Sequence, residues 1–383
     1  MHVALVTMNG NKQFSGGVTA VVMERARYLC EQGHDVSIVC RAESGFDRHE
    51  LRDGINIYPI KAVQLIKAAF AQLQSASPIF LRALRSGLEA AHKRQPLDLV
   101  DLQDGPAILG VKPFVRAHKV PMVFTLHGSA AANPGKRPWI GRKLHIAYER
   151  MAYSAATRVL AVSDWIGQVP SLLGFSHLPL AIVPSPVDES FFDISRRINM
   201  YELPLRLLFL GRIVPEKRLE VALHALAQLS GDACHLVVVG DGPDAAAMRA
   251  LADRLGVANR VTWHGYVKDR DTVRTLVAES HVVLFPTIYE AQGLAVLEAM
   301  AAGLHAIVSD IDVMAEMLPA EYRVTPDDPG AFAARIRELS TNRDLLANSE
   351  VEMRNIAGRY RRDTLYPHLL TEYHLAINEG IRA

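Results

Sequence analysis

Apolar and polar residues alternate in two distinct patterns along most of this chain. Short, nearly continuous apolar runs are separated by longer segments in which apolar residues recur with helical spacing. The runs are typical of parallel strands buried on both faces, and the longer segments are typical of amphipathic helices. The strands and helices form two successive series along the chain, and each series predicts a doubly wound α/β sheet. The first series of strands is HVALVT, DVSIVC, LDLVDLQ, PMVFTLHG and TRVLAVS, and the second is LRLLFLGR, CHLVVVGDGP, RVTWHGYV, HVVLFP and HAIVSD.

The two series meet at a proline-rich turn, VPSPVD, over residues 183–188. A chain of 383 residues is long for a single hydrophobic core, so two domains are expected. We predict an N-terminal Rossmann-like domain over 1–185 and a C-terminal Rossmann-like domain over 186–360. A last helix over 361–383 is expected to pack back across the domains, with an interruption near Pro367.

The composition is that of an ordinary globular protein. Hydrophobic residues make up 49% of the chain and charged residues 22%, and no apolar run approaches the roughly 20 residues that span a bilayer. The first residues, MHVALVTMNGN, predict a strand and carry no basic leader. The three cysteines are scattered without a C-x-x-C pair, which is typical of reduced packing residues. We therefore expect a cytoplasmic protein, with any membrane association peripheral and on the inner face.

A net charge of +1 conceals an uneven distribution of charge. Residues 1–185 carry 21 Lys and Arg against 13 Asp and Glu, whereas residues 186–383 carry 21 against 28. The basic first half predicts an anionic partner, although a chance distribution between two lobes gives the same numbers. No nucleic-acid partner is expected.

Residues 61–95 carry six Lys and Arg and one Glu among many apolar residues. A basic amphipathic segment of this kind can lie on an anionic membrane surface through side chains such as Phe80 and Leu84. The alternative is an ordinary helical layer with a solvated basic face. More basic residues follow at Lys136, Arg137, Arg142 and Lys143.

Candidate ligand-binding residues stand where the predicted strands of the first domain end. Ligands of open α/β sheets bind beyond the carboxyl ends of the strands. Gly16 and Gly17 open the helix after the first strand, and the free amides and dipole of a helix N-terminus can hold an anion. A tight turn that needs glycine is the alternative. His127 ends the strand of PMVFTLHG, where Gly128 permits close approach; it can equally be a loop residue without a ligand.

In the second domain two cations flank the turn GRIVPEK. Arg212 can grip two oxygens and Lys217 adds a point charge, so the pair suits a diphosphate. A solvated turn is the alternative.

Further along, the stretch FPTIYEAQGLAVLEAMAAG places Gly293 and Leu294 at a helix N-terminus, where their amides can bind phosphate. Glu290 and Glu298 can accept hydrogen bonds from hydroxyl groups, unless both only favour the helix dipole. Phosphates between two hydroxyl-rich groups describe a nucleotide sugar.

Two other motifs carry less weight. GDGPDA matches the dinucleotide fingerprint only in part, because no acidic residue ends the next strand. Asp310 and Asp312 form a D-x-D without an apparent third ligand, so no metal site is predicted.

The spacing E-x7-E from Glu290 to Glu298 resembles the signature of the family-4 retaining glycosyltransferases of the GT-B fold, the group 1 type. FLGRIVPEK, VVVGDGP, VTWHGYV, EQGHDVSIV and TLHG match the same family in the expected order. The resemblance covers nearly the whole chain and is tightest over 205–320. It implies an α/β architecture of two doubly wound Rossmann-like domains that face an interdomain cleft.

The resemblance also implies roles for the candidate residues. Glu290 would bind the donor-sugar hydroxyls and Glu298 the ribose, while His127 would approach the donor sugar from the first domain. Chemistry would proceed with retention and without a carboxylate nucleophile, and no metal or other cofactor is implied. The implied catalytic residues are His127, Arg212, Lys217 and Glu290, and the implied donor-binding residues are Gly16, Gly17, Gly293, Leu294 and Glu298.

The function implied is transfer of a hexose-type sugar from a nucleotide-diphosphate donor to a glycan, lipid-linked or small-molecule acceptor, in bacterial cell-surface polysaccharide or glycoconjugate biosynthesis. A non-catalytic scaffold of the same fold, a nucleotide-sugar epimerase and a phosphorylase are the alternatives. The sequence departs from the family at four places, and one of them is SDIDVMAE, which lacks the double Gly often found after the Asp of that strand. Gln292 stands where the family has Phe, Ser185 and Pro186 replace Asn-Gly, and VDLQD lacks histidines common near that strand end. These departures leave the donor sugar open.

Overall fold

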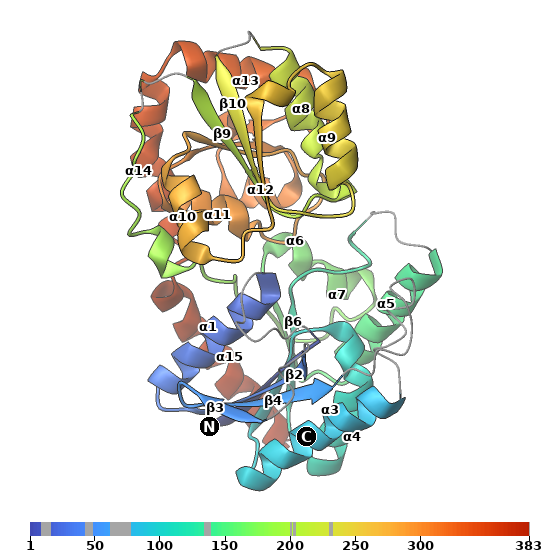
Figure 1. The fold of residues 1–383 in the computed structure, drawn as a ribbon. Coiled ribbons are helices and arrows are strands. Elements are labelled where there is room, and N and C mark those ends of the chain that lie inside the picture. The colour runs from blue at the N-terminus through green and yellow to red at the C-terminus, as the bar shows by residue number, and fades with distance from the viewer. Residues whose placement is uncertain are drawn as a thin grey trace. The chain divides into compact units, whose positions relative to one another are not determined.

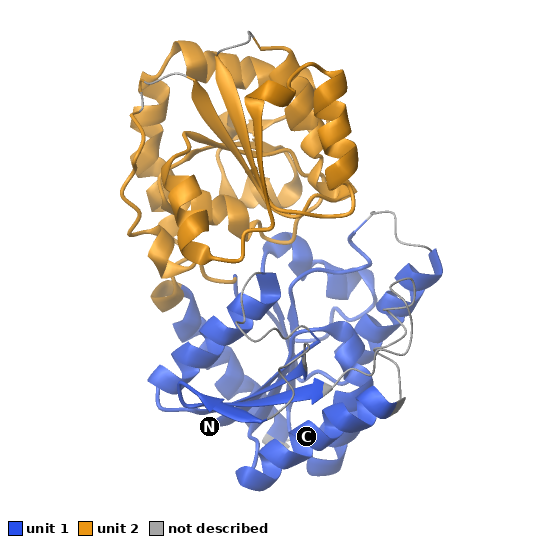
Figure 2. Ribbon diagram, in the orientation of Figure 1, with its two compact units in different colours: residues 1–184, 365–383 blue, residues 185–364 orange. Residues whose placement is uncertain are grey.

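A computed structural model describes residues 1–8, 17–42, 49–61, 78–133, 139–199, 201, 204–229 and 233–382 of the chain. It divides into two compact units, which Figure 2 colours separately. The first unit comprises residues 1–184 and 365–383, and the second comprises residues 185–364. The chain therefore passes from the first unit to the second inside the predicted proline-rich turn, and returns to the first unit within its last helix.

The first unit is built on an eight-stranded sheet in the order β3-β4-β2-β1-β5-β6-β7-β8. Neighbouring strands are parallel except β3, which runs antiparallel to β4. The strands are β1 (His2–Thr7), β2 (Asp35–Ala42), β3 (Glu50–Arg52), β4 (Ile55–Lys61), β5 (Leu99–Leu102), β6 (Met122–Leu126), β7 (Arg158–Ala161) and β8 (Leu180–Ile182).

A hairpin of β3 and β4 extends one edge of this sheet and was not among the predicted strands. Asp53 and Gly54 form its turn with φ angles of 52° and 79°. Two successive residues with positive φ suit the tight hairpin turn that Asp-Gly favours. Pro59 lies in β4 beyond the stretch that pairs with β3, so its missing amide costs no bond to that strand.

Helices cover both faces of the first sheet (Figure 1). Val3 and Leu5 of β1 pack in one cluster with side chains of α1 and α15, while Ala4 and Val6, which alternate to the opposite face, are fully buried as well. The helical segments are α1 (Gly17–Glu31), α3 (Pro78–Arg94), η2 (Gly105–Ala107), α4 (Ile108–His118), α5 (Trp139–Tyr153), α6 (Asp164–Gly167), α7 (Val169–Leu172) and α15 (Arg362–Arg382).

The last helix completes the core of the first unit. Tyr366, Leu369 and Tyr373 of α15 are fully buried in the cluster that contains the β1 side chains. The predicted interruption near Pro367 is wrong, because α15 runs continuously with this proline inside it. Pro367 is the sixth residue of this helix, so it removes the hydrogen bond that its amide would otherwise donate to the Asp363 carbonyl.

The apolar face of α3 is part of the protein core. Phe80 is 4% exposed and Leu84 is fully buried, so the prediction that they lie in a bilayer is wrong. Arg82 and Arg85 are exposed, as the alternative of a solvated basic face requires. Residues 62–77 of the predicted membrane segment lie outside the described residues. Among the helices that the structure describes, none is long and apolar enough to cross a membrane.

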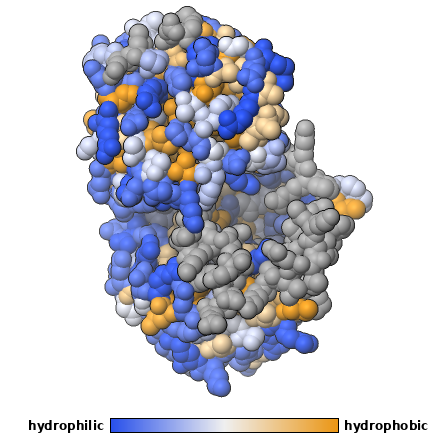
Figure 3. Space-filling model, viewed as in Figure 1, coloured by the Kyte–Doolittle hydropathy of each residue, from blue (hydrophilic) through white to orange (hydrophobic). Residues whose placement is uncertain are grey.

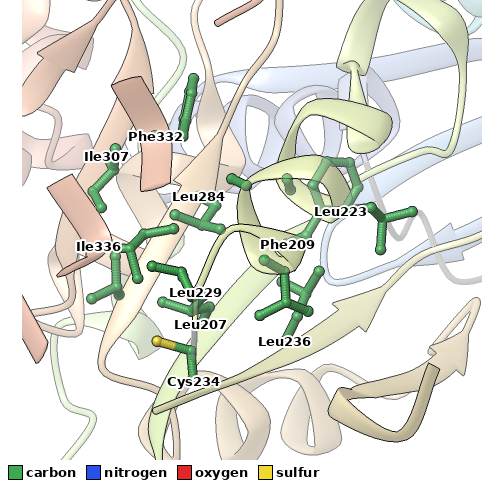
Figure 4. Close-up of a cluster of buried hydrophobic side chains, with 14 of the residues drawn as sticks. Leu207, Phe209, Leu223, Leu229, Cys234, Leu236, Leu284, Ile307, Phe332 and Ile336 are labelled. Atoms are coloured by element: carbon green, nitrogen blue, oxygen red, sulfur yellow. The ribbon is translucent and has the colours of Figure 1, made fainter. Parts of the chain in front are cut away.

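The second unit has a six-stranded parallel sheet in the order β11-β10-β9-β12-β13-β14. Figure 4 shows its core, where Leu207 and Phe209 of β9 pack with Leu223, Phe332 and Ile336 from two helices. The strands are β9 (Leu205–Leu210), β10 (Cys234–Val239), β11 (Val261–Gly265), β12 (Val282–Phe285), β13 (His305–Ser309) and β14 (Arg323–Val324).

The helical segments of the second unit alternate with its strands along the chain. They are η3 (Glu189–Phe191), η4 (Pro215–Lys217), α8 (Leu219–Ala227), α9 (Ala245–Arg254), η5 (Ala258–Arg260), α10 (Arg270–Ala278), α11 (Leu294–Ala301), α12 (Asp312–Met317), η6 (Ala320–Tyr322), α13 (Pro329–Thr341) and α14 (Asp344–Gly358).

Candidate functional site

Each sheet reverses its winding direction at one point. In the second unit the strand order steps one way from β9 to β10 and β11, and the other way to β12, β13 and β14. Since β9 and β12 are paired neighbours, the loops after them emerge side by side. Ligands of doubly wound sheets bind at such a switch point. The loop after β9 carries Arg212 and Lys217, and the loop after β12 carries Glu290.

Two glycines let the loops after β9 and β10 interlock. A Cβ on Gly240 would lie 1.8 Å from the carbonyl oxygen of Gly211, and one on Gly242 would lie 2.1 Å from that of Ile213. The Ile213 amide donates to the Asp241 carbonyl across 2.9 Å. The glycines of GDGP therefore serve close packing between two loops, and this explains the motif without a dinucleotide.

Lys217 connects the loops after β9 and β12. Its ammonium forms an ion pair with Glu290 and lies 4.8 Å from the centre of the Phe285 ring. The Ile288 amide donates to the Glu216 carbonyl across 3.0 Å. The pair is partly exposed, with 15% of the Lys217 side chain and 20% of the Glu290 side chain open to solvent, so both charges can be reached by a ligand.

The side chain of Arg212 is more exposed and less restrained than that of Lys217. Its side chain is 76% exposed, and its Nη2 lies 3.9 Å from the nearest carboxylate oxygen of Glu216. Such an exposed contact fixes a side chain weakly. The two predicted diphosphate-binding cations thus share one loop, but only Lys217 is held in place by the protein.

The predicted phosphate-binding residues Gly293 and Leu294 lie at the N-terminus of α11. Gly293 is its N-cap residue with φ 91°, a left-handed conformation that glycine adopts without strain. A Cβ there would lie 2.7 Å from the Met314 methyl group. Leu294 begins the helix, and the first amides of a helix lack intrahelical acceptors. Further along this turn, the Val296 amide already donates to the Gly293 carbonyl across 3.1 Å. Gly293 and Leu294 therefore lie where the sequence placed them, beside Glu290.

Glu298 is held by an arginine that the sequence analysis did not identify. Arg270, the first residue of α10, donates to the Glu298 carboxylate across 2.6 Å and to Asp188 across 3.3 Å. Burial raises the pKa of Glu298, and the charge of Arg270 opposes that shift, whereas Asp188 adds to it. Arg270 and Asp188 belong to no sequence motif that links them to Glu298, because the three residues meet only in the folded chain.

Two of the departures from the family pattern contact each other. Gln292 is 5% exposed. Its Oε1 accepts from the Ser185 amide across 2.8 Å, and its Nε2 donates to the Ser185 carbonyl across 2.7 Å. A Phe at this position could form neither bond. Gln292 therefore ties the segment before α11 to the first residue of the second unit.

The switch point of the first unit lies between β1 and β5. There Asp104 accepts from the Thr7 hydroxyl across 2.7 Å and from the Met8 amide across 2.8 Å. Burial raises the pKa of Asp104, although these two hydrogen bonds oppose the shift. Gly17 opens α1 with φ 51° and space around its Cβ position, whereas Gly16 lies outside the described residues.

His127 follows β6 at the same edge of the first sheet. Its Nε2 lies 2.6 Å from Oε1 of Gln103. Burial lowers the pKa of His127 to about 3, with Arg25 as a second cause, so the ring is neutral at ordinary pH. The Nε2 then donates to the glutamine oxygen, and Nδ1 is the acceptor nitrogen of the ring. A neutral acceptor suits recognition of a hydroxyl group.

The loop after His127 is fixed from α5. Glu149 is 7% exposed and accepts from the Ser129 hydroxyl and the Ala130 amide, each across 2.7 Å. Arg142 donates to the Ala130 carbonyl across 3.1 Å. These contacts restrain the loop immediately after the candidate histidine.

A buried ion pair lies within the first unit. Arg25 of α1 contacts Asp101 of β5 at 2.5 Å, and both side chains are fully buried. Thr125 donates to the second oxygen of Asp101 across 2.7 Å, and the Tyr373 hydroxyl also donates to Asp101. Helix, sheet and C-terminal helix are thereby joined through one carboxylate.

The described residues include no group of three or more His, Cys, Asp or Glu that could hold a metal ion. Asp310 of the D-x-D forms an ion pair with Arg323. This contact gives the carboxylate a structural partner.

Two family models match the chain in succession. The model described as Glycosyltransferase Family 4 matches residues 15–191, and the model described as Glycosyl transferases group 1 matches residues 191–362. Together they span most of the chain, and they confirm the resemblance drawn from the motifs.

Relatives and solved structures of similar length also match. A GDP-mannose-dependent alpha-(1-6)-phosphatidylinositol dimannoside mannosyltransferase of Mycobacterium tuberculosis is 26% identical, over 85% of this chain and 84% of its own length. A 2-deoxystreptamine glucosyltransferase of Streptomyces kanamyceticus is 26% identical, over 88% and 92%. The crystal structure of HepE from Anabaena in complex with UDP-glucose has a TM-score of 0.79 at 16% identity, over 97% and 99%. At this identity the structural likeness shows the fold, which is GT-B.

Proposed function

Because the chain belongs to the family-4, group 1 glycosyltransferases, we propose that it transfers a hexose-type sugar from a nucleotide-diphosphate donor with retention of anomeric configuration. The observation that carries the proposal is the β9–β12 switch point. Positive charge is supplied there by Lys217, Arg212 and the N-terminus of α11. The carboxylates of Glu290 and Glu298 can accept hydrogen bonds from sugar hydroxyls. The name of one relative includes GDP-mannose, and one of the similar solved structures is a complex with UDP-glucose; both support a donor of this class.

The reaction breaks the bond between the anomeric carbon and the β-phosphate oxygen. A bond to the acceptor oxygen forms on the same face of the sugar, and the acceptor proton passes to the leaving phosphate oxygen. Lys217, Arg212 and the α11 amides stabilise the charge that grows on the diphosphate, and such electrostatic stabilisation is usually the largest catalytic contribution. When the donor binds, the ion pair between Lys217 and Glu290 would open. Lys217 would then contact the donor phosphate, and Glu290 would contact the hydroxyls of the donor sugar.

No bound metal is needed in this proposal, because Lys217 and Arg212 carry the positive charge that a divalent cation would otherwise bring to the diphosphate. His127 contributes its Nδ1 acceptor to a sugar hydroxyl. It does not act as a charged acid, since its pKa is lowered to about 3 by burial and by Arg25.

The acceptor is proposed to be a glycan, a lipid-linked glycan or a small molecule of bacterial cell-surface biosynthesis. A lipid-linked acceptor is favoured by basic and apolar side chains exposed on the first unit. Arg82 and Arg85 are exposed on α3, and Trp139 and Ile140 at the start of α5 are 67% and 63% exposed. On the face shown in Figure 3, hydrophobic residues of the described chain are scattered among hydrophilic ones, so electrostatic attraction would dominate any contact with an anionic bilayer.

A donor panel tests the proposal. The purified protein is incubated with UDP-, GDP-, ADP- and dTDP-sugars, and thermal shift and slow donor hydrolysis are measured. We expect one nucleotide class to stabilise the protein and to be hydrolysed with release of the α-anomer from an α-linked donor, read by NMR. Binding without hydrolysis or transfer would favour a scaffold, and no response to any nucleotide sugar would contradict the proposal.

A further inference from the structure

Arg270 occupies an unusual position between two carboxylates. Its Nη2 donates to Glu298 across 2.6 Å and to Asp188 across 3.3 Å. Its guanidinium carbon lies 4.8 Å from the centre of the Phe191 ring. One nitrogen makes both hydrogen bonds while the planar guanidinium lies over an aromatic ring, and an ammonium lacks this planar face. Arg270 is therefore fixed by partners on three sides.

The charges around Glu298 make this arginine necessary. The side chain of Glu298 is 15% exposed, and burial disfavours its charged form. Asp188 adds a second negative charge nearby. On α14, which packs against α11, Arg354 donates to the carbonyls of Ala301 and Ala302 at the other end of α11. Arg270 is thus a cation that favours the charged form of Glu298, against burial and Asp188, and that directs its carboxylate.

The segment from Ser185 to Asp188 holds the donor-binding stretch at two places. Asp188 anchors Arg270, which holds Glu298. Independently, the peptide of Ser185 exchanges two hydrogen bonds with Gln292. These five residues come from three separate parts of the sequence, and the contacts fix both the start of α11 and the carboxylate within it.

We propose that Arg270 is a positioning residue for donor binding, which holds Glu298 so that its carboxylate accepts hydrogen bonds from the ribose hydroxyls of the donor. Asp188 anchors Arg270 in this role, and Gln292 fixes the neighbouring loop without acting on Glu298. The inference rests on the proposed function, because it assumes a nucleotide donor.

The test measures ribose recognition, not overall stability. Calorimetric affinities are measured for UDP and GDP, and then for the 2′-deoxy and 3′-deoxy analogues of the one that binds more tightly. A hydrogen bond to a charged group suggests that the wild-type protein prefers the full ribose by about tenfold or more. In Arg270→Gln this preference is expected to fall towards one, as it should in Glu298→Gln. Arg270→Lys should retain part of it.

Two controls separate positioning from general damage. Arg254 is exposed on α9 of the same unit, so Arg254→Gln should keep the wild-type preference. Gln292→Ala should weaken binding of all analogues alike. If Arg270→Gln does not fold, Arg270→Lys and Asp188→Asn carry the test, and each is expected to lower the preference.

The outcomes distinguish the inference from the proposed function. Folded Arg270 variants that keep the full ribose preference, while Glu298→Gln loses it, would overturn the role of Arg270 alone. A ribose preference that survives Glu298→Gln would overturn the role assigned to Glu298 and the inference with it. A wild-type protein that binds none of the four nucleotides of the donor panel, UDP, GDP, ADP and dTDP, would overturn the proposed function itself.

Discussion

The two sheets of this protein share one architecture but place their charges differently. In the first unit an arginine and an aspartate, Arg25 and Asp101, form a fully buried pair. In the second unit the pairs Lys217–Glu290 and Arg270–Glu298 stand at the switch point, and each of their side chains is between 15% and 35% exposed. The first pair can serve only the protein, whereas the second unit's pairs can exchange partners with a ligand.

This difference has an energetic consequence. A buried charge that loses its partner keeps its full desolvation cost, so the loss appears as instability. A partly exposed charge that loses its partner regains water, so the protein stays folded and the loss appears in binding or turnover. Mutations in the two regions should therefore change different measurements.

The largest effect is expected from Arg25→Met, which leaves Asp101 buried without its cation. Breaking a buried pair in this way costs about 3–5 kcal/mol of folding free energy, measured by urea denaturation of the first unit's transition. Arg27→Met on the same helix is the matched control, since its side chain is 48% exposed and its nearest carboxylates lie at 3.9 Å. Equal stability of the two variants would contradict the comparison.

The next effect is on turnover in the second unit. Lys217→Ala and Arg212→Ala each remove a charge that would stabilise the leaving diphosphate, and each is expected to cost about 2–4 kcal/mol of activation free energy, or roughly 30- to 1000-fold in turnover. Both variants should unfold at nearly the wild-type urea concentration. Arg249→Ala, on exposed α9 of the same unit, is the control. Near-normal turnover in both site variants would refute their assignment.

Much of the second unit could be predicted from the sequence. The strands β9, β10, β12 and β13 are nearly continuous apolar runs, a pattern that burial on both faces requires. Parallel strands bring their carboxyl ends to one edge, so Lys217 and Glu290, 73 positions apart, were expected in one site. Topology left a solvated turn as the alternative for Lys217, and the family resemblance supplied the shared site.

Other contacts could not be predicted, because side-chain direction and long-range packing decide them. Nothing in the sequence pairs Arg270 with Glu298, or Tyr373 with Asp101 across 272 positions. Likewise, the apolar face of α3 gives the same pattern whether protein or lipid covers it. By contrast, Asp53-Gly54 was a readable hairpin signal that the strand analysis missed.

A smaller effect concerns charge on the first unit's surface. If the protein binds anionic vesicles, changing Arg82 and Arg85 to Ser should weaken binding by about 1 kcal/mol for each charge, read by liposome flotation at low salt. High salt should release the wild type, since the screening length falls from about 8 Å at physiological salt to about 3 Å at 1 M. Changing Arg249 and Arg254 of the second unit to Ser is the control. A wild type that stays unbound at low salt would favour a soluble acceptor.

Acid should destabilise the protein through histidines that are neutral when folded. Burial lowers the pKa of His127 to about 3, with Arg25 as a second cause, whereas an unfolded histidine has a pKa near 6.5. Between these values the unfolded state binds more protons, so this contribution to stability is complete above about pH 6.5 and is lost progressively towards pH 3. His127→Gln should reduce the slope of unfolding free energy against pH in this window. His281 and His305 of the second unit, with pKa values lowered mainly by burial to about 4 and about 3, should keep a residual slope in that variant. An unchanged slope would mean that His127 titrates alike in both states.

The smallest effect is expected from a chelator, which should leave turnover unchanged. Lys217 and Arg212 already bring two positive charges to the place where the diphosphate would leave, and a divalent cation there would be repelled by them. Asp310 is paired with Arg323, so the D-x-D lacks a free first carboxylate. Initial rates are compared with and without EDTA, and again after magnesium or manganese is added. The double variant Asp310→Asn with Asp312→Asn should match the wild type in each condition. The opposite outcome is that EDTA abolishes turnover, that either metal restores it in the wild type, and that neither metal restores it in the double variant. That outcome would place a metal at these two aspartates, and the metal would then stabilise the leaving diphosphate in place of Lys217.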